Sequence, residues 1–200
     1  MPANLLLAWI GISDLISGLQ CPTLNIPEQS VSDQVPRFAW GHININVSNL
    51  EASIAFYEKL GFEMFIPAIP YLGLTAEPGS DAIPDASTRA LGIPPGTDGR
   101  ACIMQLDNGF PKIDLTELKD TAQEKPLNNA DLGLVRICLV SQDLQADYAR
   151  LSEQGVAFLS EPQPCKDGLA DLATCMDPDG TLIELLQVYL DKWPALPLGG

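Results

Sequence analysis

The sequence is poor in basic residues and contains a single histidine. Among its 200 residues, 11 Lys and Arg stand against 26 Asp and Glu, which gives a formal net charge of −15. Nucleic acids and anionic membrane surfaces are polyanions, and proteins bind them through Lys and Arg. We therefore expect neither a nucleic acid nor a membrane as a partner.

Long apolar segments and several well-known catalytic motifs are also missing. No stretch is long and apolar enough to predict a membrane-spanning helix. The sequence contains no Gly-x-Ser-x-Gly elbow, no Gly-x-Gly-x-x-Gly fingerprint, no P-loop and no His-Glu-x-x-His helix. The chemistries that depend on those motifs are therefore poorly supported.

Cysteines are few and follow no metal-binding or disulfide pattern. Their number is five, which is odd, and they form neither a Cys-x-x-Cys pair nor a Cys/His cluster with zinc-finger spacing. This pattern is typical of reduced, mostly buried thiols. We therefore expect a cytoplasmic protein.

The N-terminal segment begins with an apolar stretch at 5–12. It resembles the apolar part of a signal peptide, but no Lys or Arg precedes it, Asp14 interrupts it and no Ala-x-Ala site follows. Its apolar residues instead share one helical face: Leu5, Trp9, Ile12, Ile16 and Leu19. We predict an amphipathic arm and linker over 1–37, with the arm packing on the domain or on a second subunit, and we expect a homodimer.

Residues 42–61 have the pattern of a strand followed by a helix. Apolar residues alternate with polar ones from 43 to 48, as in a half-buried strand. Asn49 is placed to cap the helix, and Gly61 is placed to end it. His42, the only histidine, begins the strand on the same face as two asparagines, which favours a cleft over an apolar core.

The same unit recurs 94 residues later without a gap. The pairs His42/Arg136, Leu50/Leu144 and Gly61/Gly155 all have this offset, and Asp143 replaces Asn49 as the expected helix cap. The last strand of each copy also matches, with Asp114 and Glu184 at equivalent positions at an offset of 70. The chain therefore contains two copies of one unit, and neither copy is large enough to bury its sheet well alone.

We therefore predict an α+β fold in a domain over 38–191. It consists of two tandem βαβββ modules, at about 38–118 and 131–191, which form one curved mixed sheet around a cleft, with the helices outside. Residues 67–100 are rich in Pro and Gly, and we expect them to form a lid with a helical turn near 86–91. We assign Glu117, Asp177 and Asp179 to the surface and to turns. We assign Tyr71 to the core, with the alternative that aromatic residues near the lid line a pocket for an apolar substrate.

Two motifs resemble the vicinal oxygen chelate superfamily, which includes glyoxalase I, the bleomycin-resistance proteins and the extradiol dioxygenases. They are His-Ile-x-Ile-x-Val-x-x-Leu-x-x-Ser-x-x-Phe-Tyr at 42–57 and Asp-Pro-Asp-Gly-Thr-Leu-Ile-Glu-Leu at 177–185. The resemblance implies paired modules around a cleft. It also implies a divalent metal held at the start of the first strand and in the last strand of each module. These positions are His42, Asp114, Arg136 and Glu184.

Three of these four residues are possible metal ligands. His42, Asp114 and Glu184 would suit Fe²⁺, Mn²⁺, Ni²⁺ or Zn²⁺. Arg136 has no lone pair to give and stays protonated. We therefore favour a site with no metal cofactor, in which Arg136 lies between the two carboxylates and pairs with them. The alternatives are a metal with three protein ligands and a shifted site that recruits Glu117.

The resemblance implies an enzyme that acts on a small oxygenated organic molecule as an isomerase, a lyase or a dioxygenase-like catalyst. His42, with Asp114 or Glu184, would move a proton, and Arg136 would stabilise an oxyanion. The alternative is a protein that binds and sequesters a small molecule, as the bleomycin-resistance proteins do. The net charge of −15 suits a cationic ligand in that case.

Overall fold

A computed structural model of the chain describes residues 39–80, 82–119 and 126–193. The chain divides into two compact units, 1–41 and 42–200, and the second contains the folded domain considered below. The predicted arm and linker at 1–37 lie outside the described residues.

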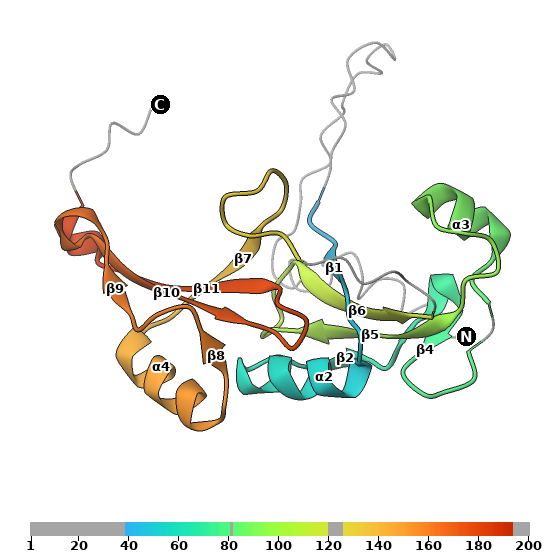
Figure 1. Ribbon diagram of the computed structural model, residues 1–200, viewed down its shortest axis with the longest axis horizontal. Coiled ribbons are helices and arrows are strands. Elements are labelled where there is room, and N and C mark those ends of the chain that lie inside the picture. Colours follow the sequence, from blue (N-terminus) through green and yellow to red (C-terminus); the bar gives the residue numbers. More distant parts are fainter. Residues whose placement is uncertain (1–38, 81, 120–125, 194–200) are drawn as a thin grey trace, which may run out of the picture. The chain divides into compact units, whose positions relative to one another are not determined.

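The first module contains a four-stranded sheet with a helix packed on one face (Figure 1). Its sheet has the order β1-β6-β5-β2, with β1 parallel to β6 and the other pairs antiparallel. The elements follow the chain as β1 (His42–Asn46), α2 (Leu50–Lys59), β2 (Glu63–Ile66), β5 (Gly99–Gln105) and β6 (Lys112–Leu118).

The second module repeats this topology. Its sheet has the order β7-β11-β10-β8, with β7 parallel to β11 and the short β9 (Gln163–Pro164) paired with β10. The main elements are β7 (Arg136–Val140), α4 (Leu144–Glu153), β8 (Ala157–Phe158), β10 (Ala170–Met176) and β11 (Leu182–Val188). The predicted α+β fold with two βαβββ units is confirmed. In place of the one continuous curved sheet that we expected, the modules form two separate mixed sheets, because β1 and β7 are the end strands of their sheets and do not pair with each other.

Equivalent residues begin and end the two helices. The side chain of Asn49 accepts a hydrogen bond from the Ala52 N–H at 2.8 Å, and the side chain of Asp143 accepts one from the Ala146 N–H at 3.0 Å. Gly61, which follows α2, has a φ of 94°, a left-handed conformation that favours glycine. The capping residues predicted from the repeat are thus confirmed.

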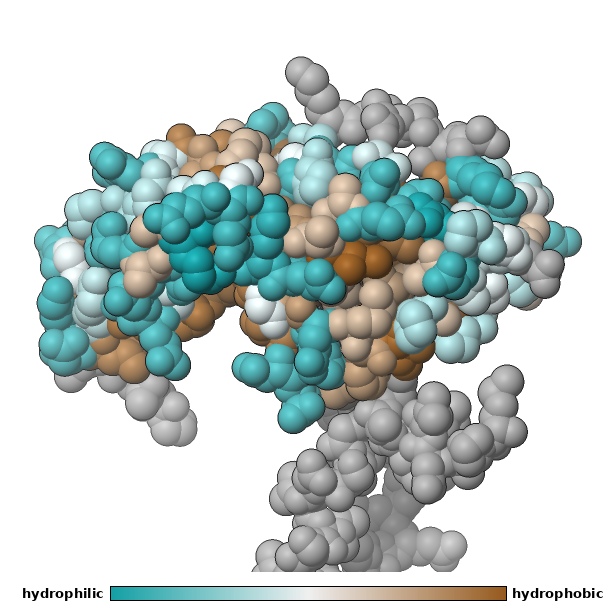
Figure 2. Space-filling view, turned by 90° about the horizontal axis from the view of Figure 1, so that it is seen from below, coloured by the Kyte–Doolittle hydropathy of each residue, from teal (hydrophilic) through white to brown (hydrophobic). Residues whose placement is uncertain are grey.

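One hydrophobic core is shared by both modules. Helices α2 and α4 lie on the same side of the sheets (Figure 1), and apolar side chains from both modules pack there in one cluster. Figure 2 views this side, where hydrophilic side chains cover most of the surface and hydrophobic ones show between them. The buried members include Ile45, Tyr57 and Leu115 of the first module and Leu144, Leu151 and Ile183 of the second.

Polar contacts also join the modules. The Tyr57 hydroxyl donates to Asp177 Oδ2 at 3.3 Å, and the Ser48 N–H donates to Asp179 Oδ2 at 2.9 Å. Asp177 is only 5% exposed, so its assignment to the surface is wrong although it does begin a turn. Its carboxylate accepts hydrogen bonds from the turn and from Tyr57, and these offset the free-energy cost of burying it.

The segment between β2 and β5 forms a lid over the opposite face of the first sheet. Its apolar side chains pack with Ala101 and Ile103 of β5 in a second buried cluster. Its elements are β3 (Ala68–Ile69), a 3-10 turn (Pro70–Leu72), β4 (Leu74–Thr75) and α3 (Asp85–Leu91). The expected helical turn near 86–91 is α3, whereas the β3–β4 hairpin was not predicted.

The described residues contain four cysteines, all of them free thiols. Cys102 and Cys175 are buried, whereas Cys138 is exposed and Cys165 is half-buried. The prediction of mostly buried thiols therefore holds for two of the four. No helix within the described ranges is long and apolar enough to cross a membrane.

Candidate functional site

A histidine and an aspartate from neighbouring strands meet on the lid side of the first sheet. The parallel register of β1 and β6 places Asn44 opposite Asp114. From the start of β1, His42 Nε2 reaches to within 3.6 Å of Asp114 Oδ2. The Asp114 side chain is 1% exposed and that of His42 is 30% exposed. Two of the four predicted site residues therefore lie together, and only the histidine is open to solvent.

The lid contributes a tyrosine to this pair. The Tyr71 hydroxyl donates a hydrogen bond to Asp114 Oδ2 at 3.3 Å. Its ring stacks near the His42 imidazole, with the ring centroids 6.4 Å apart and the planes 27° apart. The Tyr71 side chain is half exposed, so its assignment to the core is wrong. The sequence analysis predicted that this tyrosine lies in a lid, but no pattern in the sequence indicated its contact with Asp114.

The environment of Asp114 favours its protonated form. Burial raises the pKa of the Asp114 carboxyl, while the charge of His42 and the hydrogen bond from Tyr71 act in the opposite direction. Burial, together with the charge of Asp114, raises the pKa of the Tyr71 phenol to about 12. Asp114 Oδ1 is also buried and has no hydrogen-bond partner among the described residues. Burying an acceptor without a partner lowers the stability of the folded state, and such an acceptor is suited to receive a proton or a hydrogen bond from a ligand hydroxyl.

The other two predicted residues form a separate pair on the second module. Arg136 Nε donates a hydrogen bond to Glu184 Oε2, and one terminal nitrogen donates to Asn129 Oδ1 at 3.1 Å. Glu184 also accepts a contact from the Cys138 thiol at 3.7 Å. We expected Arg136 to lie between both carboxylates, but within the part of the chain that the structure describes its carboxylate partner is Glu184 alone. Asp114 instead contacts His42 and Tyr71.

A cavity of about 560 Å³ lies between the end strands of the two sheets. Residues 43–48 form one wall, and 134–137, at the start of β7, form the other. Asn44 and Asn46 are linked by a hydrogen bond of 3.0 Å on the first wall, and Arg136 belongs to the second. Of the four predicted residues, Arg136 lines the cavity, whereas His42 begins the strand that forms the opposite wall.

The family of the chain follows from its sequence over most of this domain. The model of the glyoxalase/bleomycin resistance protein/dioxygenase superfamily matches residues 39–185. The chain belongs to this superfamily. No curated protein matches the sequence.

Solved structures of the glyoxalase superfamily share the fold. A glyoxalase family protein from Bacillus cereus is similar with a TM-score of 0.61 and 18% identity, over 80% of this chain and 99% of that one. A superfamily member from Sphaerobacter thermophilus has a TM-score of 0.51 and 20% identity, over 75% and 98% of the two chains. A domain from a Frankia species has a TM-score of 0.52 and 15% identity, over 78% and 100%. At these identities the likeness concerns the fold alone.

Glyoxalase-superfamily proteins often use divalent metals, but the donor residues that the structure describes do not form a ligand set for a resident metal ion. In the described part of the chain, no three side chains of His, Cys, Asp or Glu come together as a ligand set. His42 and Asp114 lie on one module and Glu184 on the other, where its carboxylate is paired with Arg136. The guanidinium at the fourth family position has no lone pair to offer.

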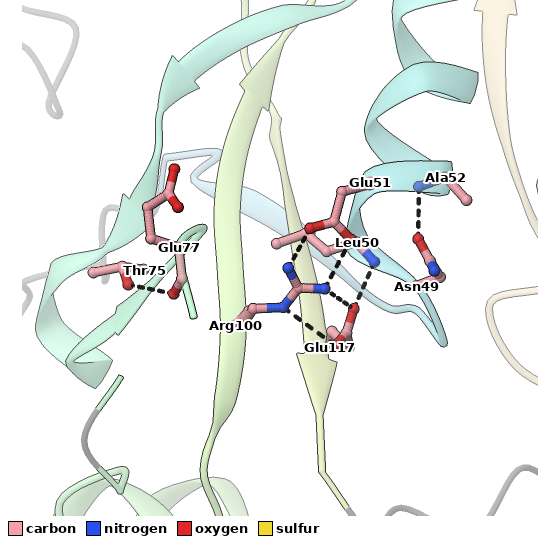
Figure 3. A network of polar contacts seen from close by, with 8 residues as sticks. All are labelled: Asn49, Leu50, Glu51, Ala52, Thr75, Glu77, Arg100 and Glu117. Carbon is pink, nitrogen blue, oxygen red and sulfur yellow. Dashed lines mark hydrogen bonds and ion pairs between the residues drawn. The ribbon is translucent and has the colours of Figure 1, made fainter. Parts of the chain in front are cut away.

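Glu117, the ligand considered for a shifted site, has a different role. Its carboxylate accepts hydrogen bonds from Arg100 of β5 at 3.3 and 2.7 Å and from the Leu50 N–H at 2.6 Å (Figure 3). Arg100 also donates to Glu51, and this hydrogen bond lowers the pKa of the Glu51 carboxyl to about 2. Glu117 therefore anchors the start of α2 to the sheet. Sequence reasoning missed Arg100, which shows no motif.

In the second module of this glyoxalase-superfamily domain, an uncharged side chain makes the equivalent contact with the start of α4. Gln187, 70 residues after Glu117, accepts a hydrogen bond from the Leu144 N–H at 2.9 Å. Its amide nitrogen donates to the Gln142 carbonyl at 2.9 Å. Glu117 and Gln187, which are equivalent in the repeat, therefore each hold the first turn of a helix, and this contact follows the same offset of 70 as the last strands.

Proposed function

We propose that this protein is an enzyme of the vicinal oxygen chelate type that moves a proton on a small oxygenated organic substrate, as an isomerase or a lyase. The observation that carries the proposal is the pair of His42 and Asp114, in which an imidazole that is 30% exposed lies 3.6 Å from a carboxyl that is almost fully buried. An exposed imidazole beside a buried carboxyl is suited to general acid–base catalysis.

The two side chains have different roles in the proposed reaction. His42 is the more exposed member of the pair, so we assign to it the removal of a proton from a carbon next to a carbonyl group. Asp114 lies behind it. The charge of the imidazolium that results acts against the burial that raises the pKa of the Asp114 carboxyl, and the ionised carboxylate then stabilises that imidazolium, because opposite charges attract strongly where water is excluded. Tyr71 fixes the carboxyl through its hydroxyl at 3.3 Å.

Arg136 would stabilise the oxygen on which negative charge develops. Its guanidinium is permanently charged and is held by Glu184 and Asn129. A substrate in the cavity along β1 would contact Arg136 on one wall, and its other end would reach toward His42 at the start of the opposite wall. A donor fixed beside a developing enolate lowers the barrier to its formation.

Sequestration of a small molecule is the second candidate. The observation that favours it is the position of the cavity, which is lined by Asn44, Asn46 and Arg136 but not by His42 or Asp114. A ligand could therefore bind between the two modules without touching the acid–base pair. Binding without turnover, unchanged by the loss of His42, would support this function.

The test is exchange of carbon-bound protons in D₂O, followed by NMR over a panel of small carbonyl compounds with acidic C–H groups. We expect His42→Ala to lower the exchange rate about 10²- to 10⁴-fold, which is the usual contribution of a general base. Arg136→Met should also lower it, whereas Arg89→Met, the same change at an exposed position on the lid helix α3, should not. Full activity in both the His42 and the Arg136 variants would refute the assignment.

The proposed reaction uses side chains of this chain and needs no resident metal. Elemental analysis of protein purified without chelators tests this part separately. We expect no transition metal in stoichiometric amount. One metal ion per chain would overturn it and would direct attention to ligands supplied from outside a single chain.

A further inference from the structure

The cavity between the end strands of the two sheets has a hydrogen-bonding side chain on each wall. Asn46 belongs to the wall formed by residues 43–48, and Arg136 belongs to the wall formed by residues 134–137. Both side chains are exposed, so a ligand in the cavity can contact them. The atoms that they present to a ligand follow from the hydrogen bonds that they already make.

A chain of hydrogen bonds fixes the orientation of the Asn46 amide. The hydroxyl of Thr116, a buried residue, donates to Asn44 Oδ1 at 2.8 Å, and Asn44 Nδ2 donates to Asn46 Oδ1 at 3.0 Å. The amide oxygen of Asn46 is therefore engaged, while its Nδ2 has no hydrogen-bond partner among the residues that the structure describes. Because Nδ2 carries two N–H groups, Asn46 offers donors to a ligand.

The guanidinium of Arg136 is held on two sides and keeps one nitrogen unused. Its Nε donates to Glu184 and its Nη1 donates to Asn129 Oδ1, whereas Nη2 makes no hydrogen bond within residues 39–80, 82–119 and 126–193. A guanidinium stays protonated and has no acceptor atom. Arg136 therefore offers a fixed pair of N–H donors, and both walls of the cavity present donors to a ligand.

We propose that the substrate is an oxo acid whose carboxylate, next to the carbonyl group, binds between Asn46 and Arg136. This inference rests on the proposed function and names its substrate class. A carboxylate only accepts hydrogen bonds, so it matches two walls of donors, and its bonds to a guanidinium are strong because both groups are charged. The two N–H groups of Nη2 donate to the carboxylate and to the neighbouring carbonyl oxygen, where the enolate charge develops. The cavity volume of about 560 Å³ suits a molecule of this kind.

An acidic residue in the same cavity limits the substrate to one carboxylate. Asp179 lines the cavity, and its Oδ2 accepts a hydrogen bond from the Ser48 N–H at 2.9 Å. Its charge repels a second carboxylate, so monocarboxylates should bind more tightly than dicarboxylates. The net charge of −15 also repels anions, but salt screens this effect beyond about 8–10 Å, whereas the contact with Arg136 is direct.

The test is binding of small ligands to the folded, full-length protein, measured by saturation-transfer NMR. The probes are pyruvate and α-ketobutyrate, each compared with its methyl ester, which keeps the carbonyl group and lacks the charge. We expect each acid to bind about tenfold more tightly than its ester, because hydrogen bonds to a charged group are the stronger ones. Equal affinity of acid and ester in both pairs, tighter binding of the esters, or no binding of either acid would overturn the proposal.

Two variants sharpen the test. Asn46→Asp keeps the oxygen that accepts from Asn44 and replaces the N–H donors by a negative charge, so it should fold with an unchanged circular dichroism spectrum and bind both acids at least about tenfold more weakly. Arg136→Met should also weaken the acids, whereas the matched change Arg89→Met on α3 should not. Unchanged affinity for the acids in the Asn46 variant would refute the assigned contact. Because binding is measured without turnover, a preference for the acids without proton exchange would refute the proposed reaction alone, and proton exchange with equal binding of acids and esters would refute this inference alone.

Discussion

Substitution of Glu117 separates the two contacts that its carboxylate makes. Glu117→Gln should keep an acceptor for the Leu50 N–H, because Gln187 makes the equivalent contact with Leu144 at 2.9 Å. It removes the charge that faces Arg100. Glu117→Ala removes both contacts and leaves the Leu50 N–H at the buried start of α2 without its partner.

The expected losses in unfolding free energy differ between these variants. Hydrogen bonds to charged groups contribute about 1.5–3 kcal/mol, but the side chains of Arg100 and Glu117 are 18% and 25% exposed, and Glu51 still holds Arg100. We therefore expect Glu117→Gln to cost about 1 kcal/mol. The unpartnered Leu50 N–H adds about 1–2 kcal/mol, so Glu117→Ala should cost about 2–3 kcal/mol.

The assay is urea unfolding followed by circular dichroism at low and high salt. The loss in the Gln variant should shrink at high salt because ions screen exposed charges, whereas the additional loss in the Ala variant should persist. Gln187→Ala is the matched control: it should lower stability without any salt dependence. Equal losses in the two Glu117 variants would show that the Leu50 contact does not anchor the helix.

Two further predictions concern buried carboxyl groups. Because burial raises the pKa of Asp114, ionisation costs the folded state more than the unfolded state, so the wild type should lose stability as pH rises through that pKa. Asp114→Asn should lack this loss, and its advantage in melting temperature should grow with pH; an advantage confined to acidic pH would contradict the sign. Tyr57→Phe should cost about 1–3 kcal/mol in urea unfolding, because it leaves Asp177 Oδ2 without its buried donor, and a cost below about 0.5 kcal/mol would count against that contact.

The repeat made most of the fold predictable. Residues match at an offset of 94 in the first strand and helix and at an offset of 70 in the last strand. These matches identify two repeats of one unit, and repeats with the same pattern are expected to fold with the same topology. Asn49 and Asp143 could be assigned as caps because a helix N-terminus needs an acceptor for its free N–H groups. These patterns depend on neighbouring residues, so they can be interpreted without knowledge of long-range packing.

The site was predictable only within each module. His42 and Arg136 begin β1 and β7, and Asp114 and Glu184 lie on the parallel neighbours β6 and β11, in each case two residues beyond the position directly opposite. The repeat indicates that these two arrangements are equivalent. How the two pairs lie with respect to each other depends on packing between modules, which no periodicity encodes. The sequence therefore suggested one four-residue site where the chain forms two pairs.

Contacts from the lid and between unlike elements could not be predicted. Tyr71 reaches Asp114 from a turn whose path depends on the apolar cluster beneath it. Lys112 stands in a strand pattern like many surface lysines, and its burial results from Phe65 and Phe110, which are far apart in sequence. Such contacts arise from three-dimensional packing, so composition and spacing carry no trace of them.

The lid joins the domain at two neighbouring points. Its ends continue from β2 and β5, which are antiparallel partners with Ile66 opposite Ile103, so the chain leaves and returns at the same end of two neighbouring strands. An insertion at such a point can lengthen, shorten or change composition without shifting the register of any strand. The cover of His42 and Asp114 can therefore diverge between related proteins, and with it the set of molecules admitted, while the scaffold that holds the acid–base pair stays constant.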